Sequence, residues 1–487
     1  MPRTVPWRRS GLLMALTFSA LQMLNEIGTM VAIPLYGSMS QELTLSPAQT
    51  TWALMSTTIF GAATIALLAK AGDRYGHRRL MIYSVAGIIA GFVISALAPN
   101  FLVLLIGRAL TGMMAGQALC IGIMNDRLTG TDKRKAIAII AGGQAIGVFC
   151  GFFLGGIIVE AGGTFRHAFW LGAALTLVSL LAFLAWGSDS DALERHAAGR
   201  PRIEVAGVVL LGIGLTLLCV GISQSTAWGL GDWRTLACIL GGLAVIALSL
   251  LVEARATHPL LDVRELAGRN LTPAYAAFLT LGVCGMLLFN AAMALLQIPG
   301  TLPLPTGPLQ IGPGFGYTAL QASFVFLPMT AAGLVAAKVI PGLLRRTSAR
   351  TGLVLGGLLM AVAFAILRVD HAHVATMLAA ILIYGFGYTT VLSTAVSVIA
   401  VEAKEGKGAG TASLYVSMAL AASSLGAAIF AALQNSYTGP ALLPDGSPIP
   451  GLPPLPQAAL FDHAFVIAAV AALVAVVAGL VLKPTRN

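Results

Sequence analysis

The sequence predicts an all-α membrane protein with fourteen helices that cross the bilayer. Hydrophobic residues make up 57% of its 487 residues and charged residues only 10%, whereas soluble domains contain about a quarter charged residues. The mean hydropathy is +0.87. Fourteen apolar runs also reach the length of about 20 residues that a helix needs to cross a hydrocarbon core.

Lipid-exposed backbone must form its hydrogen bonds within its own segment, so each apolar run is predicted to be a helix. The fourteen runs cover roughly residues 11–34, 50–70, 79–98, 101–124, 136–160, 167–187, 204–223, 234–253, 272–298, 318–340, 351–368, 374–396, 409–433 and 463–483.

The distribution of basic residues predicts the orientation of the chain. With fourteen spans, all but four of the 29 lysines and arginines fall at one side of the bilayer; the exceptions are Arg108, Arg166, Arg234 and Arg368. Because cytoplasmic loops collect Lys and Arg, both termini are predicted to be cytoplasmic, in a multi-pass protein of the inner (plasma) membrane. The net charge of +10 therefore indicates topology and not a nucleic-acid partner.

The spans divide into groups of six, two and six. The predicted units are an N-terminal bundle (1–187), an inserted helix pair with flanking loops (188–270) and a C-terminal bundle (271–487). The outer loop 434–462 is rich in proline, which excludes regular helix there. This loop is interpreted as a connector, with a cap over the vestibule or a docking site for an envelope adaptor protein as alternatives. The five cysteines lie in apolar runs, which argues against disulfides.

The loop between the second and third runs carries an acidic residue, a glycine and several basic residues at fixed offsets: Asp73, Arg74, Gly76, Arg78 and Arg79. This pattern resembles the signature loop of the major facilitator superfamily, although Ala69 occupies the place of that family's leading glycine. Gly76 allows a tight turn, and Asp73 can contact a helix N-terminus or the neighbouring arginines. The resemblance implies a conformational switch made of contacts that form in one state and break in another.

Glycines four residues apart in two runs extend the resemblance. The fourth run has Gly112 and Gly116, and the fifth has Gly147, Gly151 and Gly155; such spacing gives a smooth face for helix packing. The fifth run resembles the antiporter pattern of the superfamily, except that Phe152 stands where a proline is expected. With fourteen spans the chain is most similar to the drug:proton antiporter family. This implies two six-helix bundles with an inserted helix pair.

The first run contains polar residues spaced to share one helical face: Gln22, Asn25, Glu26 and Thr29. A charge inside a span costs at least about 2.5 kcal/mol and needs an explanation. Arg108 lies at the same predicted depth as Glu26, so the two are expected to pair. The hypothesis is that Glu26 takes up and releases a proton and Arg108 tunes its affinity. A permanent ion pair and a site for cationic cargo remain open.

Five further polar residues in the spans are candidates for a substrate cavity or for hydrogen bonds between helices. They are Gln144, Asn290, Gln297, Tyr384 and Tyr388.

Other functional classes find no support in the sequence. It has no phosphate-binding Gly-Lys-Ser loop, no His-Glu-x-x-His and no serine elbow, so neither an enzyme nor an ATP-driven pump is expected, and no metal or cofactor. The resemblance implies proton-coupled export of amphipathic small molecules by a protein working as a monomer. Proton-coupled uptake or exchange of a metabolite, and a scaffold or receptor on the same fold, remain as alternatives.

Overall fold

The computed structural model describes residues 11–113, 119–120, 123–124, 127–128, 130–186, 205–256, 259, 263, 268–304, 307–402, 408–441, 449 and 454–483. Within these residues, thirteen helices have the length and composition needed to cross a membrane. The predicted all-α membrane fold is confirmed.

The elements follow the predicted spans closely. The first part of the chain forms α1 (Leu12–Met30), η2 (Ile33–Leu35), α2 (Tyr36–Glu42), α3 (Pro47–Tyr75), α4 (His77–Ala96), α5 (Phe101–Thr111), α7 (Gly130–Glu160) and α8 (Phe165–Trp186). The middle forms α10 (Ala206–Trp228) and α11 (Trp233–Arg255). The last part forms α12 (Leu271–Gln297), α13 (Ala319–Val325), α14 (Leu327–Arg346), α15 (Ala349–Val369), α16 (Val374–Glu402), α17 (Gly408–Ser436) and α18 (Ala458–Val481).

Two spans differ from the predictions. The fourth, predicted over 101–124, is described as the short apolar helix α5, and residues 114–118 that follow it lie outside the described part. The tenth is broken at Phe326 into α13 and α14. Pro328 lies at the start of α14, and a proline cannot donate the backbone hydrogen bond that would continue α13 into α14.

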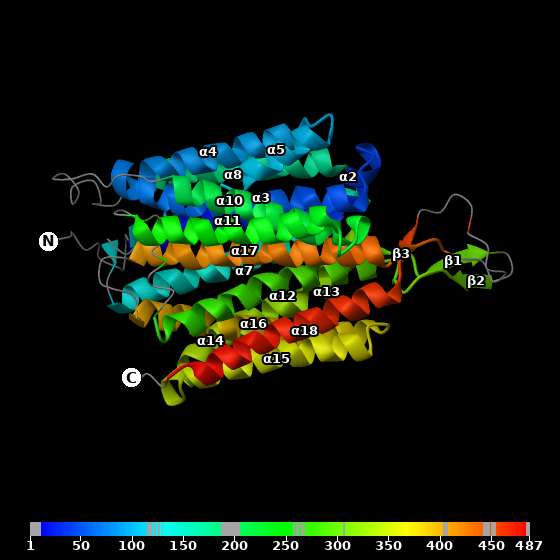
Figure 1. Ribbon diagram of the computed structural model, residues 1–487. Helices are drawn as coiled ribbons and strands as arrows, with labels where there is room; N and C mark the ends of the chain where they lie inside the picture. The colour runs from blue at the N-terminus through cyan, green and yellow to red at the C-terminus, as the bar shows by residue number, and fades with distance from the viewer. Residues whose placement is uncertain are drawn as a thin grey trace.

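Two small hairpins lie between α12 and α13 and between α17 and α18. Strand β1 (Thr301–Leu304) pairs antiparallel with β2 (Gly307–Gln310), and β3 (Thr438–Gly439) with β4 (Leu455–Pro456). Both lie at one end of the helical bundle, whereas the chain termini lie at the other (Figure 1). We call these the hairpin end and the terminal end.

Polar caps mark where several helices start. Ser46, Asn100, Asp232, Thr318 and Ser348 each accept a hydrogen bond from a backbone N–H in the first turn of the next helix. Between these ends the helices display large apolar side chains outward, for example Leu240 of α11, which is 62% exposed, and Val470 of α18, which is 61% exposed. Such a surface suits lipid rather than water.

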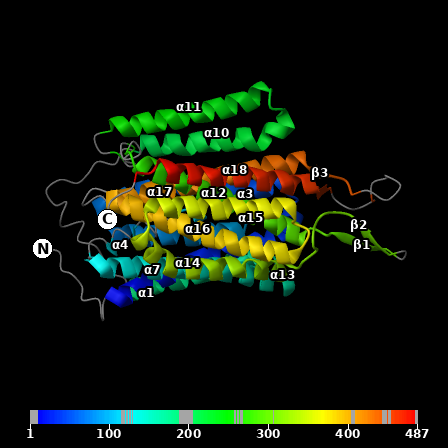
Figure 2. The ribbon, with the colours of Figure 1, turned by 90° about the horizontal axis from the view of Figure 1, so that it is seen from below.

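The two parts of the chain repeat one packing arrangement. Helix α1 packs along α7, and α12 packs along α17. The two parts meet where α3 contacts α17 and where α7 contacts α13 and α14. The α10–α11 pair lies at one side of the bundle (Figure 2), where α10 contacts both α3 and α17.

Candidate functional site: a buried carboxyl group between α1 and α7

Glu26 lies about one turn before the end of α1 and is only 8% exposed. The side-chain amide of Gln144, on α7, donates a hydrogen bond of 2.7 Å from Nε2 to Oε1 of Glu26. A buried acidic group held by a neutral amide can exist either as a carboxylate or as a carboxylic acid, since both forms can accept this bond.

Glycines bring α7 close enough to α1 for this contact. A Cβ atom placed on Gly147 would lie 2.6 Å from the carbonyl oxygen of Met23 and 3.0 Å from Cβ of Glu26. One on Gly151 would lie 2.6 Å from Cβ of Met30, and one on Gly155 2.5 Å from the carbonyl oxygen of Val31. These three glycines therefore face α1 along its length.

The remaining polar residues of α1 are buried as well. Gln22, Asn25 and Thr29 are each less than 10% exposed. The hydroxyl group of Thr29 donates to the carbonyl oxygen of Asn25 in its own helix, and Gln22 lies within hydrogen-bonding reach of Cys120. Glu26, by contrast, is directed to α7. Whether this face lines a substrate cavity stays a prediction.

The expected contact between Glu26 and Arg108 is not among the ion pairs found in the described part of this structure, and the proposed role of the pair in proton coupling stays a prediction. Among the described residues no ion pair joins them; Nε of Arg108 instead donates to the carbonyl oxygen of Ala53 at 3.3 Å, and its guanidinium lies 5.6 Å from the ring centre of Phe169. The reason is the direction of the side chains. Glu26 faces α7, whereas the face of α1 at Gly28 packs against Phe92, which lies beside Phe169.

One residue of the second half lies in the neighbourhood of Glu26. Tyr388 of α16 is near enough for a Coulombic interaction with Glu26, but none of the hydrogen bonds found among the described residues joins the two. The Tyr388 ring centre lies 5.8 Å from that of Tyr384. The other candidates on α12 bond within their own helix: Asn290 donates to the carbonyl oxygen of Met286 and Gln297 to the sulfur of Met293. The structure thus brings Gln144 and Tyr388 to Glu26, but not Asn290 or Gln297.

The loop between α3 and α4 contains the predicted tight turn. Gly76 has φ of +97°, a conformation that favours glycine. Nη2 of Arg78 donates to the carbonyl oxygen of Leu184 at the end of α8, and Arg74 lies over the ring of Tyr75. Arg79 is exposed, and the side chain of Asp73 lies outside the described part. The role of this loop as a switch stays a prediction.

Of the two glycines predicted to pack in the fourth span, the structure describes only Gly112. Gly112, at the end of α5, lies against the backbone of Thr57 and Gly61 on α3. Gly116 lies outside the described residues.

The sequence analysis missed a contact between the two halves at Phe152. This side chain is fully buried, stacks on Phe326 with ring centres 5.3 Å apart and also packs against Phe289. The hydroxyl group of Ser323 lies 2.8 Å from the carbonyl oxygen of Phe152 and equally far from that of Ala319 in its own helix, so its proton is shared between the two acceptors. Toward the hairpin end, the hydroxyl group of Thr318 donates to Glu160 at 2.7 Å. The sequence contained one indication of this contact, because a phenylalanine at position 152 replaces the proline that the family pattern has there.

Replacing Ser323 with alanine is expected to loosen this contact. The loss of one buried hydrogen bond costs about 1 kcal/mol, roughly a five-fold change in the balance between closed and open arrangements of the hairpin end. Spin labels at Ala161 and Val369 would report a larger population at long distance. Ser179→Ala is the control, because the Ser179 hydroxyl bonds within α8. An unchanged distance distribution would contradict the role of Ser323.

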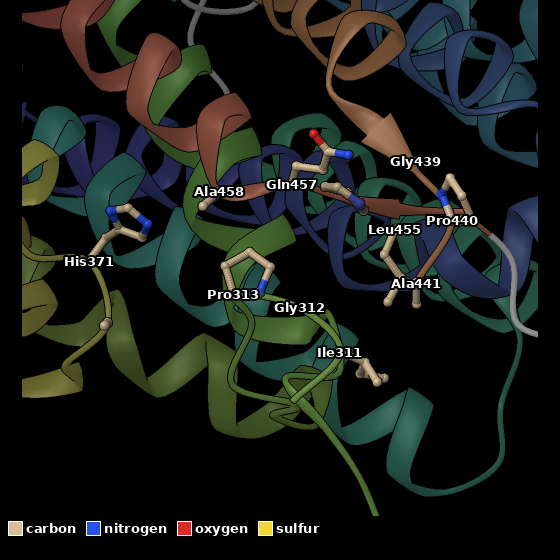
Figure 3. Close-up of a pocket in the computed structure, with 12 residues that line it drawn as sticks. Ile311, Gly312, Pro313, His371, Gly439, Pro440, Ala441, Leu455, Gln457 and Ala458 are labelled. Atoms are coloured by element: carbon tan, nitrogen blue, oxygen red, sulfur yellow. The ribbon is translucent and has the colours of Figure 1, made fainter. Parts of the chain in front are cut away.

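A separate cavity of about 520 Å³ lies among the loops at the hairpin end (Figure 3). Residues from three loops line it, including Pro313, His371, Leu455 and Gln457. Its lining shares no residue with the site around Glu26.

Comparison with known proteins identifies the chain. The model of the Major Facilitator Superfamily matches residues 18–431. The chain belongs to this superfamily. It is a multi-pass membrane transporter and not an enzyme.

Relatives of this transporter include two antibiotic export proteins. The cephamycin export protein CmcT of Amycolatopsis lactamdurans is 28% identical over 73% of the chain and 71% of the relative. The tetracenomycin C resistance and export protein of Streptomyces glaucescens is 26% identical over 88% and 77%.

Solved structures share the fold of this superfamily member. The human organic anion transporter MFSD10 superposes with a TM-score of 0.65 at 14% identity, covering 98% of this chain and all of that one. At this identity the likeness shows the fold alone.

Proposed function

We propose that this transporter exports amphipathic small molecules in exchange for protons that bind Glu26. The observation that carries the proposal is the position of Glu26, buried between α1 and α7, bonded to Gln144 and within electrostatic reach of Tyr388 on the other half. An acidic side chain in a membrane span marks an ion or proton pathway by default. The export activity of the relatives supports the direction of transport.

The proposed mechanism uses alternating access. The repeated packing of α1 on α7 and of α12 on α17 supports two related bundles that rock against each other. When the site opens to the outside, Glu26 takes up a proton, and the neutral acid then avoids the cost of a buried charge while the site is closed. When the site opens to the inside, Glu26 releases its proton as cargo binds. A proton returning inward supplies about 2.3 kcal/mol per 100 mV of membrane potential.

We place both termini in the cytoplasm and the protein in the inner (plasma) membrane. The terminal end of the bundle carries Arg255, Arg269, Arg346, Arg350 and Lys483 at the ends of its helices. This concentration of basic residues supports the cytoplasmic assignment.

A deletion strain tests the function. Loss of the transporter is expected to raise susceptibility to its cargo, and a protonophore is expected to remove the difference between the deletion strain and its parent. Purified protein in proteoliposomes with an imposed pH gradient should then move the same compound. A compound that accumulates with the proton gradient would instead support uptake, which the phenylalanine at position 152 favours as the second candidate. Transport that ignores the gradient would exclude both.

A further inference from the structure

Helices α10 and α11 form one tight hairpin. A Cβ atom on Gly214 would lie 2.7 Å from the side chain of Ile246, and one on Gly242 would lie 2.7 Å from the backbone nitrogen of Leu218. The hydroxyl group of Ser249 donates to the carbonyl oxygen of Gly207 at 2.6 Å. Contacts this close do not allow the two helices to move separately.

Polar side chains attach this hairpin to α17. The amide of Asn435 donates to the carbonyl oxygen of Ser223 at 3.1 Å. Ser424 lies near Cys219, but its hydroxyl group donates to the carbonyl oxygen of Ala421 in its own helix. Nearer the hairpin end, the hydroxyl group of Thr226 donates a long hydrogen bond of 3.5 Å to the carbonyl oxygen of Ala432. Two hydrogen bonds at different levels therefore tie α10 to α17.

The contact between α10 and α3 has a different character. Apolar side chains of α10, such as Leu211 and Leu215, pack in one cluster with Ile59 of α3. The hydrogen bonds of α10 found among the described residues go to its own helix, to α11 and to α17. Gly212 faces Ala63, where a Cβ atom on Gly212 would lie 3.3 Å from that of Ala63. The contact at Gly212 is looser than the 2.7 Å contacts of Gly214 and Gly242 with α11, and no hydrogen bond found in the described part of this cluster fixes its register. A shift of α10 along α3 therefore breaks fewer directional contacts than a shift along α17.

We propose that the α10–α11 hairpin travels with the second half of the transporter and slides over α3. The inference rests on the proposed alternating access. Helix α10 contacts both α3 and α17, which belong to different halves. If the halves rock, α10 can remain fixed to only one of them. Its hydrogen bonds to α17 indicate that this is the second half. The inserted pair is then a functional part of the C-terminal body that covers the α3–α17 junction (Figure 2).

Two disulfides that share α10 test this. Ser424→Cys places a thiol beside the native Cys219 and would join α10 to α17. Ala63→Cys with Gly212→Cys would join α10 to α3, at a Cβ separation of 3.3 Å, close to the 3.5–4.5 Å usual for disulfides. Transport in proteoliposomes is expected to continue after oxidation of the first variant and to stop after oxidation of the second, with recovery on reduction. The oxidised parent protein is the control. The reverse pattern, or the same effect of both disulfides, would overturn the proposal.

Distances between spin labels test the movement without a transport assay. Leu230, Leu97 and Val369 are exposed at the hairpin end, in the α10–α11 turn, the first half and the second half respectively. When pH and cargo are varied, the 97–369 distance is expected to change with the 230–97 distance, while the 230–369 distance stays constant. A constant 97–369 distance would refute rocking, and with it the sliding. A changing 230–369 distance beside a constant 230–97 distance would refute only the assignment of the hairpin to the second half.

Discussion

Glu26→Gln is expected to abolish proton-driven transport while the protein still folds and inserts. Glutamine has nearly the shape of glutamic acid, and its carbonyl oxygen can still accept the hydrogen bond from Gln144. It cannot gain or lose a proton in the working range of pH. Proteoliposomes with an imposed pH gradient should therefore show no gradient-dependent flux, which removes the driving force of about 2.3 kcal/mol per 100 mV for each proton.

Glu42→Gln is the matched control for this experiment. Glu42 lies in α2 at the hairpin end and pairs with Arg166 at 3.2 Å, away from the core of the bundle. This variant is expected to keep its gradient dependence. If Glu26→Gln transports at the normal rate and still follows the pH gradient, Glu26 does not carry the proton.

Gly147→Leu is expected to impair both folding and transport. Any side chain at this position meets the backbone of Met23 and the Cβ atom of Glu26 at 3.0 Å or less, so α1 must move away from α7. Overpacking of this kind costs about 1–3 kcal/mol. The same displacement separates Glu26 from Gln144. Thermal unfolding of the purified protein should shift to lower temperature, and the flux in proteoliposomes should fall.

Gly142→Leu is the control for Gly147→Leu, because it makes the same change of helix propensity at a position without close packing. Gly142 lies on the same helix, but a Cβ atom there meets nothing within 4 Å. Leucine is the better helix former, so this variant is expected to be as stable as the parent protein or more stable. Equal behaviour of the two leucine variants would contradict the close approach of α1 and α7.

The membrane fold could be predicted from the sequence because lipid imposes simple rules. Run length and the placement of basic residues located the helices to within a few residues for most spans, for example 79–98 against His77–Ala96. The break at Phe326 could not be placed in the same way. A proline near the outer end of a span is tolerated in a membrane helix, so Pro328 alone does not predict where α13 ends.

The partner of Glu26 could not be predicted for a geometric reason. The rise per residue gives the depth of a side chain, but not the direction in which it points. Arg108 matches Glu26 in depth, yet it lies against Ala53 and Phe169. Gln144 was noted in the sequence as a candidate for a substrate cavity or for a hydrogen bond between helices. It lies on α7, whose glycines determine which side of α1 meets α7, and this packing brings Gln144 to Glu26.

The contacts between the halves depend on tertiary packing that spacing does not reveal. Tyr388 and Glu26 lie more than 360 positions apart in the chain, and nothing local links them. Phe152 was noted only as a departure from a family pattern. Its position between Phe289 and Phe326 follows from the break in the tenth span, which the sequence did not show.

In the proposed transport cycle, the glycine face of α7 has a consequence for how protons and cargo would compete. Because Gly147, Gly151 and Gly155 pack closely on α1, Glu26 and Gln144 would stay on one rigid body and keep their hydrogen bond throughout that cycle. The variable in the environment of Glu26 is then the approach of the opposite body, with Tyr388 at its surface. The coupling between the proton gradient and the cargo gradient would then depend on the distance between the two bundles at Glu26. It would not depend on a rearrangement inside the first bundle.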